Sequence, residues 1–276
     1  MNRHITWVVC AAIVWAGWAT GRAGATTITL KQGVNGYAGC TDTYIDADNP
    51  NTNYGEQWYM HLYMSNHNPK RSDLVKFDLA GQIPAGQTIV SATLGLWVYQ
   101  IVDMTSGDWA DVAPYRVRGT RGWVENQATW NVFKGSTYWA TAGCENTSFD
   151  RYGAYDGTAI RFTKDSPVNC YYTWDVTSSV QTWYAGSEAN NGWLVRIVAH
   201  DGGTDGLSMN TSESSSASYR PYLTITYVPE PATVSLLALG GTGLLARCGR
   251  RARGCRRRQS TSEPNGFPLV RQRRFR

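Results

Sequence analysis

The stretch Thr88-Ile-Val-Ser-Ala-Thr-Leu-Gly-Leu-Trp-Val-Tyr-Gln100 decides the expected fold, because apolar residues recur at every second position in it. Ala92, Leu94, Leu96 and Val98 would share one face of an extended chain, which is the period of a half-buried β-strand. Similar short segments lie at residues 74–79, 112–117, 159–162, 171–176, 193–199 and 222–227. Clusters of turn-forming residues separate these segments. The sequence therefore predicts an all-β domain, a jelly-roll β-sandwich.

One short helix is expected within this pattern. Thr177 is the candidate N-cap, after which Val180, Trp183 and Tyr184 recur at helical spacing and Gly186 ends the helix. Because the segment is so short, we expect it to cover one end of the sandwich.

Composition and charge narrow the class of protein. Glycine (28 residues) and aromatic residues (12%) are abundant, whereas charged residues make up only 17% of the chain, which is typical of short strands joined by turns. The net charge of +5 comes from the C-terminal end, where 11 arginines follow residue 246. Residues 26–228 hold 13 Lys and Arg against 19 Asp and Glu, a net charge of −6. We expect no nucleic-acid partner, because one would require a basic face on the domain itself.

Residues 1–25 are typical of a secretory signal peptide. A positively charged start is followed by an apolar run from Ile5 to Trp18 and by the triplet Ala23-Gly24-Ala25. Such a triplet is a cleavage site, and we expect cleavage after Ala25. The alternative is an uncleaved membrane anchor, for which the apolar run is short, since a spanning helix needs about 20 residues.

The segment 229–258 combines three features in a fixed order. The motif Pro229-Glu230-Pro231 comes first, an apolar stretch over 232–246 follows, and a group of arginines that includes Arg250 and Arg251 closes the segment. This order resembles the PEP-CTERM sorting signal of bacteria. The resemblance implies a hydrophobic C-terminal helix in the membrane, with its arginines on the cytoplasmic side, until an exosortase-type enzyme removes it. A plain single-span anchor is the alternative.

The middle of the chain remains as one globular domain, residues 26–228. Beyond the sorting segment, residues 259–276 form a basic extension that we expect to be disordered. With either kind of tail the domain lies outside the cell. We therefore expect an exported protein of the cell surface or extracellular matrix that is transiently anchored in the cytoplasmic membrane.

Short motifs spread over residues 40–227 resemble the DNRLRE domain, a module grouped with carbohydrate-binding modules. They are Asp42-Thr43-Tyr44-Ile45, Asn53-Tyr54-Gly55, Val75-Lys76-Phe77-Asp78-Leu79, Trp123-Val124-Glu125, Thr129-Trp130-Asn131, Trp174-Asp175-Val176-Thr177 and Arg220-Pro221-Tyr222-Leu223. The resemblance implies a β-sandwich that binds polysaccharide, with alginate as a substrate class of some relatives. One departure is Thr211-Ser212-Glu213-Ser214, which lacks the arginine of the family's Ser-Arg-Glu. The motif residues have structural explanations, so they indicate a fold rather than a site.

The loop from Lys134 to Gly157 is the candidate carbohydrate site, since long loops between strands often carry function. Aromatic rings pack on the C–H face of a sugar while polar groups bind its hydroxyls. Basic residues beside the rings favour an acidic polysaccharide such as alginate. The predicted binding residues are Trp139, Tyr138, Tyr152, Tyr155, Lys134 and Arg151. The alternative is that these rings pin the loop to the domain.

Cysteines and acidic residues give two weaker predictions. Three cysteines lie in the domain, so at most one disulfide forms within it, and we expect it between Cys144 and Cys170, which bracket a loop-rich segment. Asp201 and Asp205 lie in a glycine-rich loop and are candidate ligands of a structural Ca²⁺. The loop lacks EF-hand spacing, and simple turn chemistry is the alternative. No other cofactor is expected.

No catalytic residues are predicted. The histidines form no HExxH or HxH spacing, and the chain has no GxSxG motif. We therefore expect a protein that binds polysaccharide without cleaving it. Two alternatives stay open: a structural matrix or adhesin protein without a ligand of its own, and a small polysaccharide lyase or hydrolase, whose paired carboxylates need only be close in space.

Overall fold

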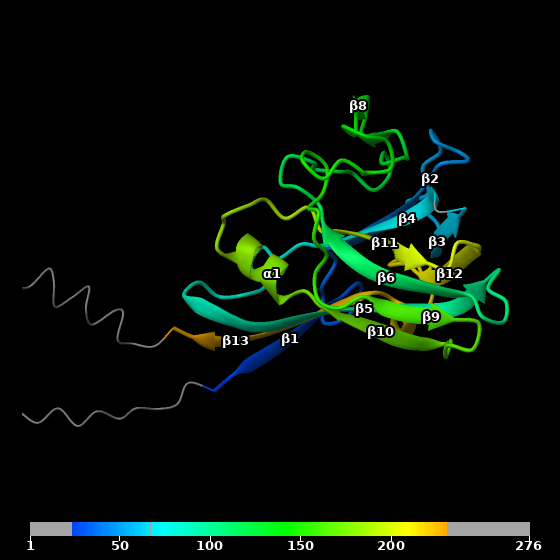
Figure 1. Ribbon diagram of the computed structural model, residues 1–276. Coiled ribbons are helices and arrows are strands. Elements are labelled where there is room, and N and C mark those ends of the chain that lie inside the picture. The colour runs from blue at the N-terminus through cyan, green and yellow to red at the C-terminus, as the bar shows by residue number, and fades with distance from the viewer. Residues whose placement is uncertain (1–23, 67, 231–276) are drawn as a thin grey trace, which may run out of the picture. The chain divides into compact units, whose positions relative to one another are not determined.

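The computed structural model describes residues 24–66 and 68–230. Within them the chain forms thirteen strands, one α-helix and one 3₁₀ turn (Figure 1). The strands are β1 (Thr26–Lys31), β2 (Cys40–Asp46), β3 (Tyr59–Ser65), β4 (Asn68–Phe77), β5 (Gln87–Val102), β6 (Trp109–Arg116), β7 (Val132–Lys134), β8 (Thr137–Tyr138), β9 (Ile160–Thr163), β10 (Cys170–Asp175), β11 (Trp193–His200), β12 (Thr204–Asn210) and β13 (Tyr222–Pro229). The helix α1 covers Thr177–Tyr184, and the 3₁₀ turn η1 covers Ala217–Tyr219.

Eleven of these strands form one antiparallel sheet that curls on itself. Nine follow the order β1-β13-β5-β12-β3-β4-β11-β6-β9, while β10 pairs with β5 and β2 pairs with β4. The curl brings β9 beside β10 (Figure 1). There the ring centres of Phe162 and Tyr172 lie 4.5 Å apart. The predicted all-β class with one short helix is confirmed.

The long strand β5 carries much of the main core. Its inward side chains Leu94, Leu96 and Val98 are completely buried, as the alternation of the sequence predicts. Burying one leucine stabilises the fold by about 1.5–3 kcal/mol, so a strand with several such residues anchors the sheet. The residues between them face the other way, and on this outer face Trp97 and Tyr99 stay partly exposed.

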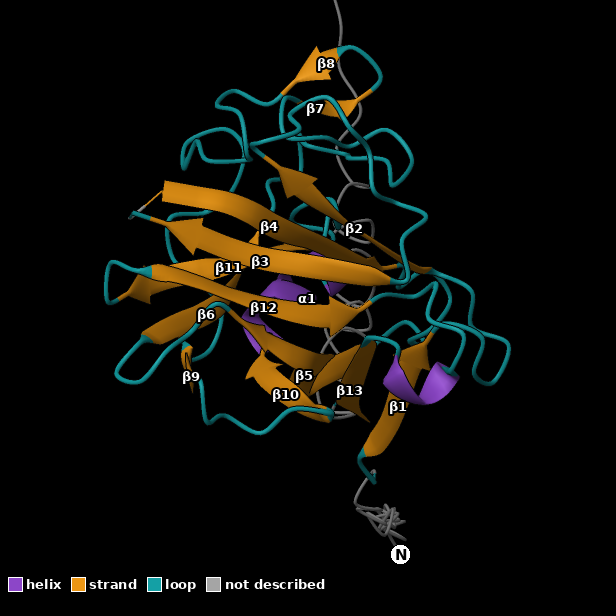
Figure 2. Ribbon diagram, turned by 90° about the vertical axis from the view of Figure 1, so that its right-hand side faces the viewer, coloured by secondary structure: helices purple, strands orange, loops and turns teal. Residues whose placement is uncertain are grey.

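A second, smaller core lies on the outer side of β2, β4 and β11. Ile45, Leu74 and Leu194 from these strands belong to a cluster separate from the main core. They are covered by side chains of residues 117–157, a region that we call the cap lobe. Its contributing residues are Val117, Trp123, Ala128, Phe133, Trp139 and Cys144. The short hairpin of β7 and β8 stands at the tip of this lobe (Figure 2).

The helix begins at Thr177, one residue earlier than it would if this threonine were the N-cap. Its N-cap position is Val176, which makes no side-chain capping bond, so the prediction of Thr177 as the N-cap is wrong by one residue. Thr177 Oγ1 instead accepts the amide of Ala92 at 2.9 Å, which ties the helix to β5. Asp175 supports the same junction, because its Oδ1 accepts the amide of Thr177 at 2.9 Å.

A strand pair bounds the described domain. β1 and β13 run antiparallel, with Thr26 opposite Tyr227. The predicted domain limits of 26 and 228 therefore fall at the outer ends of this pair. Residues 1–23 of the predicted 25-residue leader lie outside the described residues, as does the tail beyond Glu230, with Pro231, Arg250 and Arg251. Within residues 24–66 and 68–230, no helix has the length and apolar character needed to cross a membrane.

Candidate functional site

Trp139, the first of the predicted sugar-binding rings, is buried in the cap lobe. Only 4% of its surface is exposed, and its ring packs against Phe133. Its indole N–H donates to the carbonyl of Thr129 at 3.0 Å. The ring thus holds the lobe together and offers no open face to a ligand, which is the alternative that the sequence left open.

Arg151 and Tyr152 are engaged within the protein as well. Arg151 is 8% exposed and donates to Glu145 Oε2 at 3.0 Å. The hydroxyl of Tyr152 donates to Glu188 at 3.0 Å, and two arginine guanidinium groups each lie 4.1 Å from its ring centre. The two terminal nitrogens of Arg151 and the hydroxyl of Tyr152 all donate within the protein, so the geometry favours a structural role for both residues.

The other predicted binding residues are exposed but lie on different elements. Tyr138 is 68% exposed and shares the β7–β8 hairpin with Lys134. Tyr155 is 42% exposed and packs edge-on against Tyr115 of β6, with ring centres 5.6 Å apart. Their contact with a sugar stays a prediction, and Tyr138 is the most accessible ring among them.

The predicted disulfide between Cys144 and Cys170 is not formed, because Cys40, Cys144 and Cys170 are all free thiols. Cys144 is fully buried in the second core under the cap lobe. Cys170 begins β10, where it lies opposite Val98 of β5, and its thiol donates to the carbonyl of Pro167. Bracketing one loop in the sequence therefore does not bring the two thiols together.

The two predicted calcium ligands are brought together with a histidine. Ligand atoms of His200, Asp201 and Asp205 lie within 4.8 Å of one another. Asp205 Oδ2 lies 3.0 Å from His200 Nδ1, and burial raises the pKa of this aspartate. Asp201 Oδ1 accepts the amide of Gly203 in a tight turn. One oxygen of Asp205 is thus paired with the imidazole, and one oxygen of Asp201 with the turn amide. This arrangement fits the alternative, in which the aspartates stabilise the turn.

A hollow lined by aromatic rings lies on the outer side of the main sheet. We call it the aromatic groove, and its volume is about 570 Å³. Its lining residues are Trp58, Trp97, Tyr99, Asn169, Asn210, Glu213, Ser214, Ser215 and Tyr219. Rings and polar groups thus meet in one open depression, which is the composition of a site for a polyhydroxylated ligand.

The groove arises where two strands part along one edge of β5. Leu94 pairs with β10 on one side and with β13 on the other, whereas Val98 pairs with β10 and with β12. β12 and β13 therefore follow one another along the same edge of β5. Between them the chain leaves the sheet over residues 211–221, which include η1, and this loop supplies one wall of the groove.

Two pairs of rings line the groove. Trp58 and Tyr99 have ring centres 5.5 Å apart with planes inclined at 34°, and Trp97 and Tyr219 have centres 4.7 Å apart at 35°. Trp58 is 51% exposed and Tyr219 is 42% exposed. Neither indole N–H donates a hydrogen bond to a residue of the described chain. Each pair thus has one exposed ring, Trp58 or Tyr219, and the two indole N–H groups have no partner within the described chain.

The aromatic surface continues from the groove onto β10 and β13. The ring centre of Tyr171 lies 5.0 Å from that of Trp97 and 4.8 Å from that of Tyr222. Tyr222 packs over Gly95, where a Cβ would come within 2.3 Å of the ring. Lys31 Nζ donates to the Tyr171 hydroxyl at 2.9 Å, and burial lowers the pKa of this lysine. An extended row of rings therefore runs across three strands.

Polar side chains surround these rings. Asn210 Nδ2 donates to Ser214 Oγ at 3.4 Å, and Asn169 turns the chain into β10 with a φ of 58°, a value that asparagine tolerates. Amide and hydroxyl groups both donate and accept hydrogen bonds. The groove can therefore bind hydroxyls of either orientation beside a stacked ring.

Glu213 belongs to the groove and also to a group of three carboxylates, which we call the carboxylate cluster. Oxygen atoms of Asp42, Glu125 and Glu213 lie within 4.8 Å of one another. Burial, followed by the negative charge of Glu213, holds the pKa of Asp42 well above its usual range. Burial also raises the pKa of Glu125 to about 7. Three acids at this spacing cannot all be ionised without a compensating charge.

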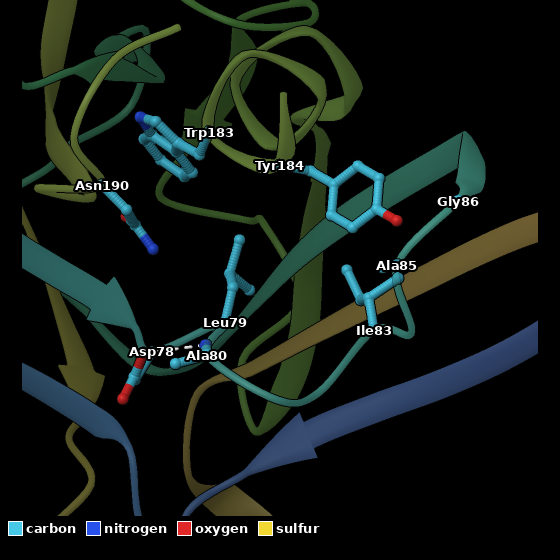
Figure 3. A pocket seen from close by; sticks show the side chains of 9 residues that line it. All are labelled: Asp78, Leu79, Ala80, Ile83, Ala85, Gly86, Trp183, Tyr184 and Asn190. Atoms are coloured by element: carbon cyan, nitrogen blue, oxygen red, sulfur yellow. Dashed lines mark hydrogen bonds between the residues drawn. The ribbon is translucent and has the colours of Figure 1, made fainter. Parts of the chain in front are cut away.

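A second hollow, of about 540 Å³, lies beside the helix (Figure 3). Apolar groups such as Leu79 and Ile83 face the rings of α1 there. The hydroxyl of Tyr184 donates to the carbonyl of Pro84 at 2.6 Å, and Asn190 donates to the end of β4 at 2.7 Å. Because these polar groups are used within the protein, the aromatic groove is better suited to a sugar.

The sequence held one signal for the groove that the loop prediction passed over. Trp97 and Tyr99 alternate with the buried Leu96 and Val98, so they occupy positions where a half-buried strand usually carries polar residues. Two large rings at such positions indicate a binding surface. Nothing in the local sequence links Trp58 to them, because only strand pairing brings that ring to β5.

Fold and groove together define a class: a curled antiparallel β-domain with an open aromatic surface on its outer side. The chain belongs to the disaggregatase related repeat domain family, whose sequence profile matches residues 42–225. No curated protein matches the chain. The matched family has a different name from the DNRLRE domain that the motifs resemble, so that finer assignment stays a prediction.

The tail has a match of its own. Residues 228–252 match the PEP-CTERM protein-sorting motif, which confirms the sorting segment predicted around Pro229, Glu230 and Pro231. Such a motif marks an exported protein that exosortase-type machinery sorts at the membrane. The matched range begins in β13 and continues past the described residues.

Proposed function

We propose that the domain binds carbohydrate chains in the aromatic groove without cleaving them. The binding would hold this exported protein on polysaccharide at the cell surface or in the extracellular matrix. The observation that carries the proposal is the two open ring pairs of the groove, whose indole N–H groups have no partner in the described chain. Sugars stack on such rings through their C–H faces while their hydroxyls take up the free donors.

The shape of the aromatic surface favours a polymer over a single sugar. The rings run from Trp58 through Trp97 and Tyr171 to Tyr222, across β5, β10 and β13. A row of this kind contacts several sugar units of one chain, and each contact is weak alone. Binding strength would come from contacts repeated along a polymer.

The charge of the groove favours a neutral polysaccharide. Glu213 is the only charged residue among the nine that line it, and residues 26–228 carry a net charge of −6. A uronate would meet this carboxylate at close range and be repelled. We therefore propose neutral chains as the preferred ligands, and alginate as a ligand only where a cation bridges it to the protein.

Affinity electrophoresis of the purified protein tests the proposal in gels that contain neutral polysaccharides or alginate. Trp58→Ala and Trp97→Ala should each weaken retardation by about 10-fold, which corresponds to about 1.4 kcal/mol for one stacking contact. Tyr138→Ala is the matched control, since it removes an exposed ring of the cap lobe and should bind as wild type.

Three results would contradict the proposal. Lost binding in Tyr138→Ala together with unchanged binding in both groove variants would return the site to the 134–157 loop. A wild-type protein that no polysaccharide retards would indicate a structural matrix role. New reducing ends or unsaturated products after incubation with the bound polysaccharide would indicate an enzyme.

A further inference from the structure

The carboxylate cluster lies where three distant parts of the chain meet. Asp42 comes from β2, Glu125 from the cap lobe and Glu213 from the loop after β12. The amide of Asp42 donates to Glu125 Oε1 at 2.7 Å, and the amide of Ser212 donates to Asp42 Oδ2 at 2.9 Å. Backbone groups thus hold the carboxylates together, so their closeness is built into the fold.

Asp42 also carries an oxygen atom without a partner. Its side chain is 0% exposed, and its Oδ1 accepts no hydrogen bond from a residue of 24–66 or 68–230. The other oxygen, Oδ2, takes the amide of Ser212 and the thiol of Cys40, which lies 3.6 Å away. Buried polar atoms in folded proteins are nearly always satisfied. The free Oδ1 therefore leaves a position for a proton shared with Glu213 or for a cation in its place.

The surroundings of the cluster are strongly negative. Asp73 lies nearby, and burial, followed by the charge of Asp42, raises its pKa. The positive charge of Lys76 lowers the pKa of Glu125, but burial raises this pKa by more. Its Nζ lies 4.7 Å from the ring centre of Trp123. One ammonium group cannot balance four carboxyl groups, so protons or a further cation must do so.

We propose that the carboxylate cluster binds a calcium ion. Carboxylate oxygens prefer hard cations such as Ca²⁺ and Mg²⁺. At Ca–O distances of about 2.3–2.6 Å, oxygens on opposite sides of the ion lie about 4.6–5.2 Å apart, which accommodates all three carboxylates within 4.8 Å. Mg²⁺ demands near-ideal octahedral geometry and gives up its waters reluctantly, so a site built of protein carboxylates favours calcium. Glu213 is exposed, so water can fill the remaining positions of the six to eight that calcium uses.

A calcium ion here would tie the wall of the aromatic groove to the rest of the domain. Glu213 is shared between cluster and groove, and Ser214 and Ser215 beside it line the groove. The ion would fix this wall to β2 and to the cap lobe. The inference does not rest on the proposed function, since the carboxylates are gathered by the fold alone.

Calorimetric titration of the purified full chain with CaCl₂, after removal of metal with EDTA, tests the site. We expect one ion per chain, a Kd of about 10⁻⁴–10⁻³ M as in other extracellular modules, and binding of MgCl₂ at least about 10-fold weaker. Glu213→Gln and Asp42→Asn should each weaken calcium binding by about 100-fold, because each removes a charged ligand. The asparagine of Asp42→Asn is neutral, so it can be buried without a proton or a cation to balance it. In EDTA the melting temperature of this variant should therefore equal or exceed that of wild type.

Asp201→Asn is the matched control, because it removes a carboxylate from the His200 group and should bind calcium as wild type. Calcium binding that is lost in Asp201→Asn but kept in Glu213→Gln would place the ion in that other loop and overturn the proposal. No binding to wild type up to about 10⁻² M CaCl₂, or equal affinity for MgCl₂, would overturn it as well. No polysaccharide is present in these titrations, so their failure is distinct from failure of the proposed function.

Discussion

A single glycine makes room for the aromatic surface. Gly95 lies opposite Tyr222 in the pairing of β5 with β13, and the ring of that tyrosine occupies the space that a side chain would take. Glycine usually weakens a strand, so its presence in the middle of β5 marks a close approach of another group. Here the group that approaches is part of the row of rings beside the groove.

Replacing this glycine should damage both fold and binding. In Gly95→Ala the new Cβ would clash with the ring of Tyr222, and we expect a loss of about 1–3 kcal/mol in the free energy of unfolding, measured with urea. Polysaccharide retardation should weaken in the same variant. Gly122→Ala is the control, since its Cβ would lie 3.7 Å from the nearest side chain and should change stability by less than about 0.5 kcal/mol. Equal stability of both variants would contradict the close approach.

Glu125 should make stability depend on pH. Its pKa is raised by burial from 4.5 to about 7, so the folded protein keeps a proton that the unfolded chain loses near pH 4.5. The contribution of this residue to the free energy of unfolding is therefore fully present below pH 4.5 and is lost as the pH rises to about 7. Burial lowers the pKa of His61 to about 4, which gives an opposite slope at mildly acidic pH.

The difference between wild type and Glu125→Gln isolates the effect of this carboxyl group. In EDTA, the stability of wild type relative to the variant should fall between pH 4.5 and about 7, measured by urea unfolding at several pH values. A difference that stays constant over this range would show that Glu125 titrates normally. Added CaCl₂ should reduce the fall, because the ion takes the place of the proton.

At the scale of elements, the cap lobe is organised around one buried carboxylate. Residues 139–150 contain no strand or helix. Asp150 is fully buried there and accepts the amides of Ala140 at 2.8 Å and Thr141 at 2.9 Å. It also accepts a hydrogen bond from Nε of Arg121 at 2.7 Å. This side chain supplies the hydrogen bonds that a sheet would otherwise provide.

Asp150→Asn should therefore destabilise the lobe. The neutral amide leaves Arg121 without its charge partner, and we expect a loss of about 3 kcal/mol, measured by thermal unfolding. Hydrogen exchange should speed up over residues 139–150. Asp165→Asn is the control, because the Asp165 side chain is 78% exposed and its pair with Lys164 should contribute less than about 1 kcal/mol. A loss that is equal in both variants would contradict the role of Asp150.

Elements were more predictable than the site. The alternation in 88–100 predicts the core of β5, and helical spacing predicts α1 to within one residue at its start, because both patterns are local. The groove depends on Trp58 and Tyr219, which reach β5 only through strand pairing and the loop after β12. Trp139 is a predicted sugar-binding residue but is buried in the second core. A core made of loop side chains has no periodicity in the sequence, so it is easily taken for a binding surface.

At the scale of the whole chain, both predicted processing positions fall beside the same strand pair. Thr26 is the first residue of β1 and directly follows the predicted cleavage site at Ala25. The sorting motif begins at Val228, and β13 ends at Pro229. Cleavage after Ala25 and after Pro229 would remove leader and tail and leave every strand whole.

Mass spectrometry of the protein from its native host checks this processing. The mature chain should begin at Thr26, end shortly after Pro229 and lack Arg250 and Arg251. Glu230→Ala, which lies in the sorting motif but outside β13, should retain the tail while the domain melts at the same temperature as wild type. An intact chain from wild-type cells would contradict removal of the tail.

The pairing of Thr26 with Tyr227 also bears on the order in which the exported chain folds and loses its tail. Secretion delivers a polypeptide amino end first, so β1 arrives outside before any other strand and stays without its partner until β13 follows. The last strand to emerge is β13, which lies between β1 and β5 in the sheet and overlaps the start of the sorting motif. We therefore expect removal of the tail to follow the pairing of β13 with β1 and β5, so that a molecule whose last strand is unpaired is still held at the membrane.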